Sequence, residues 1–245
     1  MDLLYIILAV AGTIFAGIAI VKYLPLKFQW LVSIVLGVIA IFLVIGIYDG
    51  IMAPIKFNAE KKVRYAKVIN SLKIIRDAEQ AHFEVTGDYS NNFDNLIKFI
   101  DTAEFAITQV KNVPKTINLG GGITKEIEER VIDTIGFESV KEKMFAGRDY
   151  NNMMNVPGTD VKFELETTKI EKLEGLVVPA FRARVDKAYV LEGLNKDLVR
   201  VEKEVLGGDE VKGEYVSVGS LDEVSTAGNW PPSYDKGDRK PTEEE

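Results

Sequence analysis

Cysteine is absent from this chain of 245 residues, and histidine occurs only once, as His82. The absence of thiols excludes thiol catalysis, disulfide bonds and thiolate metal sites. One histidine excludes a multi-histidine metal centre, and a Ser-His-Asp triad would depend on His82 alone. The residues therefore predict no catalytic site, no metal site, no cofactor and no enzymatic activity.

Basic residues are in the minority, because 30 Lys and Arg stand against 37 Asp and Glu and give a net charge of −7 at pH 7. General nucleic-acid binding needs a basic face, so we expect no nucleic-acid partner. No small-molecule substrate is evident from the sequence.

Charge is missing altogether from two stretches, residues 3–21 and 30–48, which contain no Lys, Arg, Asp, Glu or His. A helix of this length reaches about 28 Å, close to the hydrocarbon thickness of about 30 Å. Pro25, between the stretches, favours a turn. The pattern predicts a transmembrane helical hairpin over residues 1–50, embedded in a lipid bilayer. After Tyr48 no uncharged run approaches such a length, which excludes a polytopic transporter.

Lysine and arginine around the second stretch bear on orientation. Lys56, Lys61, Lys62, Arg64 and Lys67 follow it, and by the positive-inside tendency they favour a cytoplasmic soluble part. Two lysines in the loop between the stretches oppose this, so the side of the soluble part stays open. We expect an integral protein of a bacterial inner (cytoplasmic) membrane.

A basic cluster follows the membrane segment and consists of Lys61, Lys62, Arg64 and Lys67. If it faces the cytoplasm, such a cluster binds anionic lipid with about 1 kcal/mol per residue. Solvation of an ordinary helix surface explains the same pattern, so both interpretations stand.

Residues 51–87 predict a long amphipathic helix next to the membrane. Pro54 is expected to break the second span, and Asn58 is a good N-cap for a new helix. Gly87 supplies the left-handed position that ends a helix. Because such a helix is longer than a small domain needs, we expect a stalk that packs only its C-terminal half on the head.

Residues 88–228 predict a small α+β head that contains an antiparallel sheet. Phe93, Leu96, Ile97 and Ile100 follow a helical period, and Thr124 is suited to capping a short charged helix. A further helix is expected at 194–206, with an apolar stripe of Leu194, Leu198, Val201 and Val205 on one face. Strands are expected at 105–110, 134–139, 161–167, 176–185 and 215–218. Glu164 and Glu166 resemble a catalytic pair, but alternation with apolar residues is typical of a half-exposed strand.

Residues 229–245 are polar, contain prolines and end in acidic residues, which predicts a disordered acidic tail. Trp230 is unusual in such a tail. It either packs onto the head as a latch or stays exposed as an interaction site for a partner.

Many residues after the second span resemble a family of Bacteroidota membrane-anchored proteins without an assigned function. The likeness rests first on a block that contains Pro54–Asn58, Glu60–Lys62, Arg64, Val68–Ile69, Leu72, Ile75–Arg76, Ala78, Gln80–Ala81, Gly87, Tyr89, Phe93–Asp94, Leu96–Ile97 and Phe99. It continues in Asp133–Ile135, Gly175–Val185, Gly193–Leu194, Val218–Ser220 and Ala227–Trp230. The relatives begin with one anchor and this chain with two, so the resemblance carries no orientation.

The order of a membrane helix, a long helix, a glycine stop and a short aromatic helix also resembles type IV pilins and pseudopilins. The prepilin cleavage site with its Glu is missing here, and a hairpin anchor does not suit a filament. That alternative predicts a span that continues straight into the long helix.

The favoured function is therefore a non-enzymatic structural or scaffolding component of a bacterial envelope assembly. It would act by protein–protein contact with other proteins or as a homo-oligomer. The alternatives are a pilin-like assembly subunit and an enzyme with a carboxylate-based or Ser/Lys-based site that the sequence does not reveal.

Overall fold

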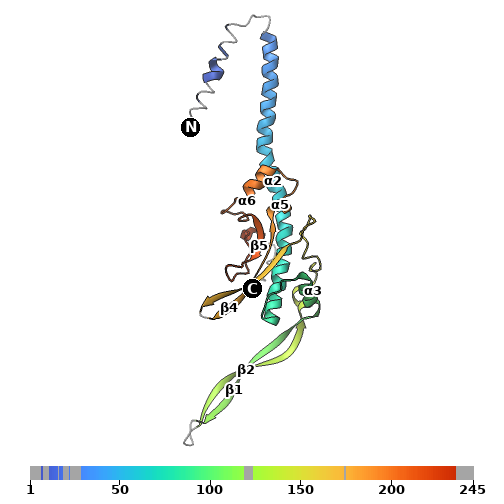
Figure 1. Cartoon of the computed structure of the whole chain (residues 1–245), viewed down its shortest axis with the longest axis vertical. Helices are drawn as coiled ribbons and strands as arrows, with labels where there is room; N and C mark the ends of the chain where they lie inside the picture. The colour runs from blue at the N-terminus through green and yellow to red at the C-terminus, as the bar shows by residue number, and fades with distance from the viewer. Residues whose placement is uncertain are drawn as a thin grey trace, which may run out of the picture. The chain divides into compact units, whose positions relative to one another are not determined.

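The computed structural model describes residues 7, 11–15, 17–18, 22, 29–118, 124–173 and 175–235. The fold is α+β, with one long helix and two small antiparallel sheets (Figure 1). The chain divides into two compact units, Met1–Lys56 and Phe57–Glu245. The described positions of the first hydrophobic stretch are helical, but most of that stretch, the loop with Pro25 and hence the predicted hairpin lie outside the described residues.

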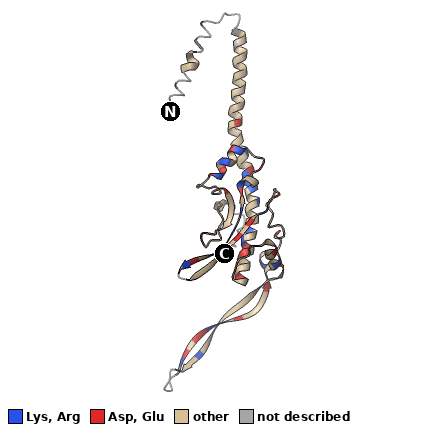
Figure 2. Ribbon diagram, viewed as in Figure 1, with Lys and Arg blue, Asp and Glu red and all other residues tan. Residues whose placement is uncertain are grey.

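The first unit contains the N-terminal part of helix α2 (Gln29–Thr86), the one helix among the described residues that is long and apolar enough to cross a membrane. An 18-residue window of α2 has a mean hydropathy of 2.5, and none of it is buried inside the protein. Figure 2 shows this part of the helix with almost no charged residues. A core helix of a soluble protein would be covered by other elements, whereas side chains such as Phe42 and Val44 are 70% and 65% exposed.

The predicted break between the second span and the next helix is wrong. Helix α2 continues without interruption from Gln29 to Thr86, with Pro54 inside it. A proline removes one backbone hydrogen bond of a helix. Ending the helix there would leave about four N–H and four C=O groups without partners, which is the larger loss.

In the second unit, α2 forms the centre of the hydrophobic core. Its buried side chains begin at Phe57 and recur at helical spacing as Tyr65, Val68, Ile69, Leu72, Ile75, Ala78 and Ala81. Packing therefore starts 30 residues before Gly87, and the expectation that only the C-terminal half packs is wrong. Gly87, with φ of 83°, ends the helix as predicted, and its N–H donates to the carbonyl of Phe83 at 2.8 Å.

Helix α3 (Phe93–Thr102) follows, capped by the Asn92 side chain, which accepts a hydrogen bond from the Asp94 N–H. Leu96 and Ile100 are buried, as their spacing predicts. The chain then forms a two-stranded antiparallel ribbon of β1 (Glu104–Asn118) and β2 (Thr124–Ser139), followed by α4 (Val140–Met144).

The expected helix at Thr124 is wrong, because β2 begins there and pairs with β1 residue by residue. Local propensity of the charged segment is overridden by backbone pairing with a strand that precedes it.

The second sheet has the order β3 (Glu164–Leu173), β4 (Leu176–Asp186) and β5 (Tyr215–Gly219), all antiparallel. Phe181, Ala183 and Val185 of β4 alternate into the core that also contains the buried face of α2. β5 pairs only with Arg182–Asp186, so Pro179 lies where β4 has a neighbour on the β3 side alone. This is the edge position that proline tolerates.

Short helices connect the remaining elements: α5 (Lys187–Val190), α6 (Lys196–Lys203) and the 3-10 helix η2 (Pro232–Tyr234). The expected helix at 194–206 is thus present but shorter. Its predicted apolar stripe is displaced, because Val201 is 58% exposed while Glu202 is buried.

Residues 229–235, predicted as the start of a disordered tail, are instead packed on the second unit. Trp230 is 8% exposed and belongs to the core, and its indole N–H donates to Asp235 Oδ1 at 3.1 Å. Lys73 of α2 donates to the Tyr234 carbonyl at 2.8 Å. The buried indole ring and these two hydrogen bonds hold residues 229–235 on the second unit. The polar composition of the segment does not indicate this packing. Residues 236–245 lie outside the described part.

We predict that Gly219→Ala destabilises the second unit more than Gly208→Ala. Both glycines have positive φ, 76° and 84°, where an alanine costs about 1–2 kcal/mol. A Cβ at Gly219 would also collide with the Phe181 carbonyl, whereas one at Gly208 would meet open space. Urea unfolding should show an additional loss of about 1–3 kcal/mol for Gly219→Ala. Equal losses would contradict the close approach of β5 to β4.

Candidate functional site

Four charged side chains gather where α2, α5, α6 and the segment before β5 meet. We call them the charge cluster: Lys61, Lys187, Glu202 and Glu210. Lys61, Lys187 and Glu202 are 4%, 0% and 5% exposed. Removing charges from water is costly unless they are paired, and here two ammonium groups face two carboxylates.

Lys61 of α2 lies between the two acids. Its Nζ is 2.9 Å from Glu202 Oε2 and 2.8 Å from Glu210 Oε2. Burial lowers the pKa of the Lys61 ammonium, but the hydrogen bonds to Glu210 and Glu202 outweigh it, so the pKa lies above its ordinary value. Lys61 is therefore a permanent cation at neutral pH.

Lys187 of α5 approaches Glu202 from another side. Its Nζ donates to the carbonyls of Glu202 and Val211 at 2.7 and 2.8 Å, and it lies 3.4 Å from Glu202 Oε1. Burial lowers the pKa of Lys187, against the attraction of Glu202. Tyr65 donates its hydroxyl to Glu202 Oε1 at 3.3 Å, so Glu202 joins α2, α5 and α6.

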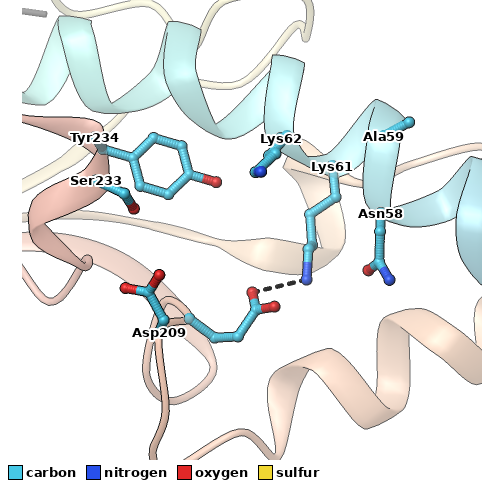
Figure 3. A pocket seen from close by; sticks show the side chains of 8 residues that line it. Asn58, Ala59, Lys61, Lys62, Asp209, Ser233 and Tyr234 are labelled. Atoms are coloured by element: carbon cyan, nitrogen blue, oxygen red, sulfur yellow. Dashed lines mark hydrogen bonds and ion pairs between the residues drawn. The ribbon is translucent and has the colours of Figure 1, made fainter. Parts of the chain in front are cut away.

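A pocket of about 510 Å³ opens beside the charge cluster. Figure 3 shows Lys61 and Lys62 from α2 on one side, and Asp209, Ser233 and Tyr234 across from them. Burial raises the pKa of the Tyr234 hydroxyl, with a further contribution from Glu210. The lining therefore offers both signs of charge and a neutral phenol.

The chemistry of the charge cluster is limited by how its two amines are used. A lysine acts as a nucleophile only when it is neutral and reachable. Lys61 is held as an ammonium by two acids, and Lys187 is enclosed and already donates to two carbonyls. The arrangement supports a structural tie between helices. Among the described residues, no group of three or more His, Asp or Glu side chains is placed to hold a metal ion.

A second buried acid, Glu79 of α2, lies outside the charge cluster. It is fully buried, its Oε2 accepts from the Ser90 N–H at 2.9 Å, and its Oε1 has no hydrogen-bond partner. Burial raises the pKa of Glu79 to about 8, and the Ser90 hydrogen bond opposes this only in part. Glu79 is thus a neutral carboxylic acid at pH 7 that holds the turn between α2 and α3.

The structure separates the four residues of the predicted basic cluster. Lys61 does not face outward, because it belongs to the charge cluster. Arg64 pairs with Glu60 at 3.1 Å and donates to the carbonyls of Val190 and Glu192 at 3.1 and 2.8 Å. Lys62 and Lys67 remain exposed. Half of the cluster therefore serves internal packing.

Trp230, predicted as a latch or as an exposed interaction site, is buried against the backbone of Gly228, where a Cβ would overlap the indole ring. The ring therefore offers little surface to a partner.

The β1–β2 ribbon is a surface that we did not predict as functional. Its base is anchored, because Phe105 and Val140 are 5% and 0% exposed. Beyond the base, large apolar side chains are exposed by 41% to 68%: Ile107, Val110, Val113, Val131, Ile132, Ile135 and Phe137. An isolated two-stranded ribbon is marginally stable in water, and exposed apolar patches mark interaction sites.

We predict that Glu202→Ala strongly destabilises the second unit. The substitution leaves Lys61 with Glu210 alone and Lys187 without its carboxylate. Breaking a buried pair in this way costs about 3–5 kcal/mol. Urea unfolding of the detergent-solubilised chain, followed by Trp230 fluorescence in a Trp30→Phe background, measures the loss. Glu204→Ala, on an exposed side chain next to α6, is the control and should change stability by about 0.5 kcal/mol or less.

We also predict that stability falls as pH rises through the interval between the two pKa values of Glu79. The ordinary value is 4.5 and the folded value is about 8. Between them the folded chain keeps a proton that the unfolded chain has released, so unfolding becomes easier with rising pH and levels off above about pH 8. Glu79→Gln cannot ionise, and its stability relative to the native chain should rise by about 4 kcal/mol from pH 5 to pH 9. The exposed Glu84→Gln should show no such rise; an identical response of both variants would refute the assignment.

Comparison of the chain with protein-family models, with curated proteins and with solved structures finds no match. The resemblances to the Bacteroidota family and to pilins therefore stay predictions, and the function has to be argued from the geometry described above.

Proposed function

We propose that this protein is a membrane-anchored, non-enzymatic scaffold of a bacterial envelope assembly that acts by protein–protein contact. The observation that carries the proposal is the uncovered apolar surface of α2, of which a whole 18-residue window is unburied. Exposing such a surface to water is unfavourable by about 25 cal/mol per Å², and lipid removes that cost.

The proposed anchor is a hairpin of residues 3–21 and 30–48 in the inner membrane, followed by a stalk and an α+β head. The second stretch is supported by its length and its exposure, and the first by its charge-free sequence. Lys62 and Lys67 remain available after the span and favour a head on the cytoplasmic side, where they meet anionic lipid.

The contact function is supported by the β1–β2 ribbon. A soluble unit whose only role was to fold would gain nothing from a long ribbon with exposed isoleucine and phenylalanine side chains. In the proposal, this ribbon is the arm that engages other proteins, whereas the charge cluster keeps the body to which it is attached rigid.

A pilin-like assembly subunit is the second candidate, and one observation favours it. Helix α2 runs without interruption through Pro54 to Thr86, which is the continuity that this alternative predicts. A pilin-like subunit needs a single span, so the number of spans separates the two candidates.

We predict that membrane topology will show two spans. The chain lacks cysteine, so Asp2→Cys, Lys27→Cys and Asp222→Cys each introduce a unique thiol. A membrane-impermeant maleimide on intact spheroplasts and on inverted vesicles then reports the side of each position. The hairpin requires positions 2 and 222 on one side and position 27 on the other, in a protein that resists carbonate extraction.

Positions 2 and 27 on the same side, with position 222 opposite, would replace the hairpin by a single span and favour the pilin-like subunit. Release of the chain by carbonate would remove the anchor, and the scaffold proposal with it.

A further inference from the structure

The outer edges of the β1–β2 ribbon differ from each other. In the described residues no third strand pairs with either edge. Pro114 lies in the middle of β1, opposite Glu128, and a proline has no N–H to offer. It therefore fits where the backbone of β1 points away from β2, which interrupts the outer edge of β1 for an added strand. The edge of β2 has no proline.

Some charged side chains of β2 form ion pairs with β1, and others form none with the described residues. Asp133 and Glu129 pair with Lys111 and Lys115 at 3.4 and 2.7 Å. In contrast, the Arg130 side chain makes no hydrogen bond or ion pair in the described part, and the Glu128 side chain accepts only from Asn112, at 3.3 Å. Glu128 and Arg130 are therefore exposed charges of opposite sign on one strand, and both can form ion pairs with a partner.

The sequence of charges in β2 is complementary to the same sequence in a second, antiparallel copy of the strand. In an antiparallel pair related by a two-fold axis at Glu129, Glu128 faces Arg130 of the second copy. In the same register Ile127 faces Val131 and Lys125 faces Asp133, while Glu126 faces Ile132. Glu129 faces its own copy, but each of these carboxylates already has Lys115 beside it. Opposite charges directly across strands stabilise a sheet by about 0.2–1 kcal/mol per pair.

Registers with the two-fold axis at Glu128 or Arg130 place fewer opposite charges across from each other. An axis at Glu128 leaves one opposite-charge pair, Glu126 with Arg130, and places Glu128 against its own copy without a lysine at hand. An axis at Arg130 places Arg130 against itself and aligns Ile127 with Asp133. An axis at Glu129 is therefore the favoured register.

We infer that β2 pairs edge to edge with β2 of a second copy of this chain, forming a four-stranded sheet β1-β2-β2-β1 with its two-fold axis at Glu129. The inference rests on the proposed contact function of the ribbon and names its partner. Pairing satisfies the outward N–H and C=O groups of β2 and extends a marginal ribbon to four strands.

Cross-linking in native membranes tests the register. In antiparallel pairs the Cα atoms of facing residues are about 4.5–5.5 Å apart, which is within disulfide range. Glu129→Cys, in a chain without other thiols, should therefore give a disulfide-linked dimer under mild oxidation. Val113→Cys, which pairs with Glu129 but lies on β1, should give none, because two strands separate it from its own copy.

A charge exchange separates pairing from chance collision. Glu128→Arg and Arg130→Glu, each in the Glu129→Cys background, place like charges across the axis and should lower the dimer yield by about ten-fold, that is, by about 1.4 kcal/mol. The double variant Glu128→Arg/Arg130→Glu restores opposite charges and should return the yield to within about two-fold of the start.

Absence of the Glu129→Cys dimer, an equal yield for Val113→Cys, or no rescue by the double exchange would overturn the inference. If Glu129→Cys instead links to a different protein, the second copy is excluded while the contact function survives. If it links to nothing, both fail.

Discussion

A buried ammonium group must find its acceptors inside the protein, and this requirement ties the second unit together. Lys61 and Lys187 come from helices α2 and α5, and both meet Glu202 of α6. Neither lysine can be left alone without a large desolvation cost, and in the observed arrangement of the three helices each of these charges has a partner. The core around Tyr65, Val68 and Leu72 supplies the burial, and the charge cluster joins α2, α5 and α6 by hydrogen bonds and ion pairs.

The local elements with a clear period were predictable. The end of α2 at Gly87, the helix around Leu96 and Ile100, and the strands that became β4 and β5 follow from apolar spacing and turn residues. The β1–β2 ribbon was predicted only at its base, because its outer half lacks a buried face and is held by pairing between strands. Thr124 shows the same limit, since a cap residue in front of a charged run indicates a helix until another strand competes for its backbone.

The charge cluster was not predictable for a related reason. Lys61 stands among other basic residues, and nothing near it in the sequence shows that Glu202 and Glu210 will cover it. In α6, the apolar spacing of Leu198 and Val201 suggested the buried face, but Glu202 occupies it because its carboxylate is needed by two lysines. Trp230 was a better signal: a large aromatic residue among prolines pointed to packing, although the composition of residues 229–235 pointed to disorder.

The distance along the chain between Lys61 and Glu202, 141 residues, has a consequence for biosynthesis. Helix α2 leaves the ribosome before α6. The hydrogen bond from Lys73 to the Tyr234 carbonyl forms later still, because Tyr234 lies 161 residues downstream of Lys73. Throughout that delay the nascent polypeptide carries the inner face of α2 without the strands and helices that later cover it. Trp230 lies furthest along the sequence among the buried core residues, so the core of the second unit closes only after that segment has been translated.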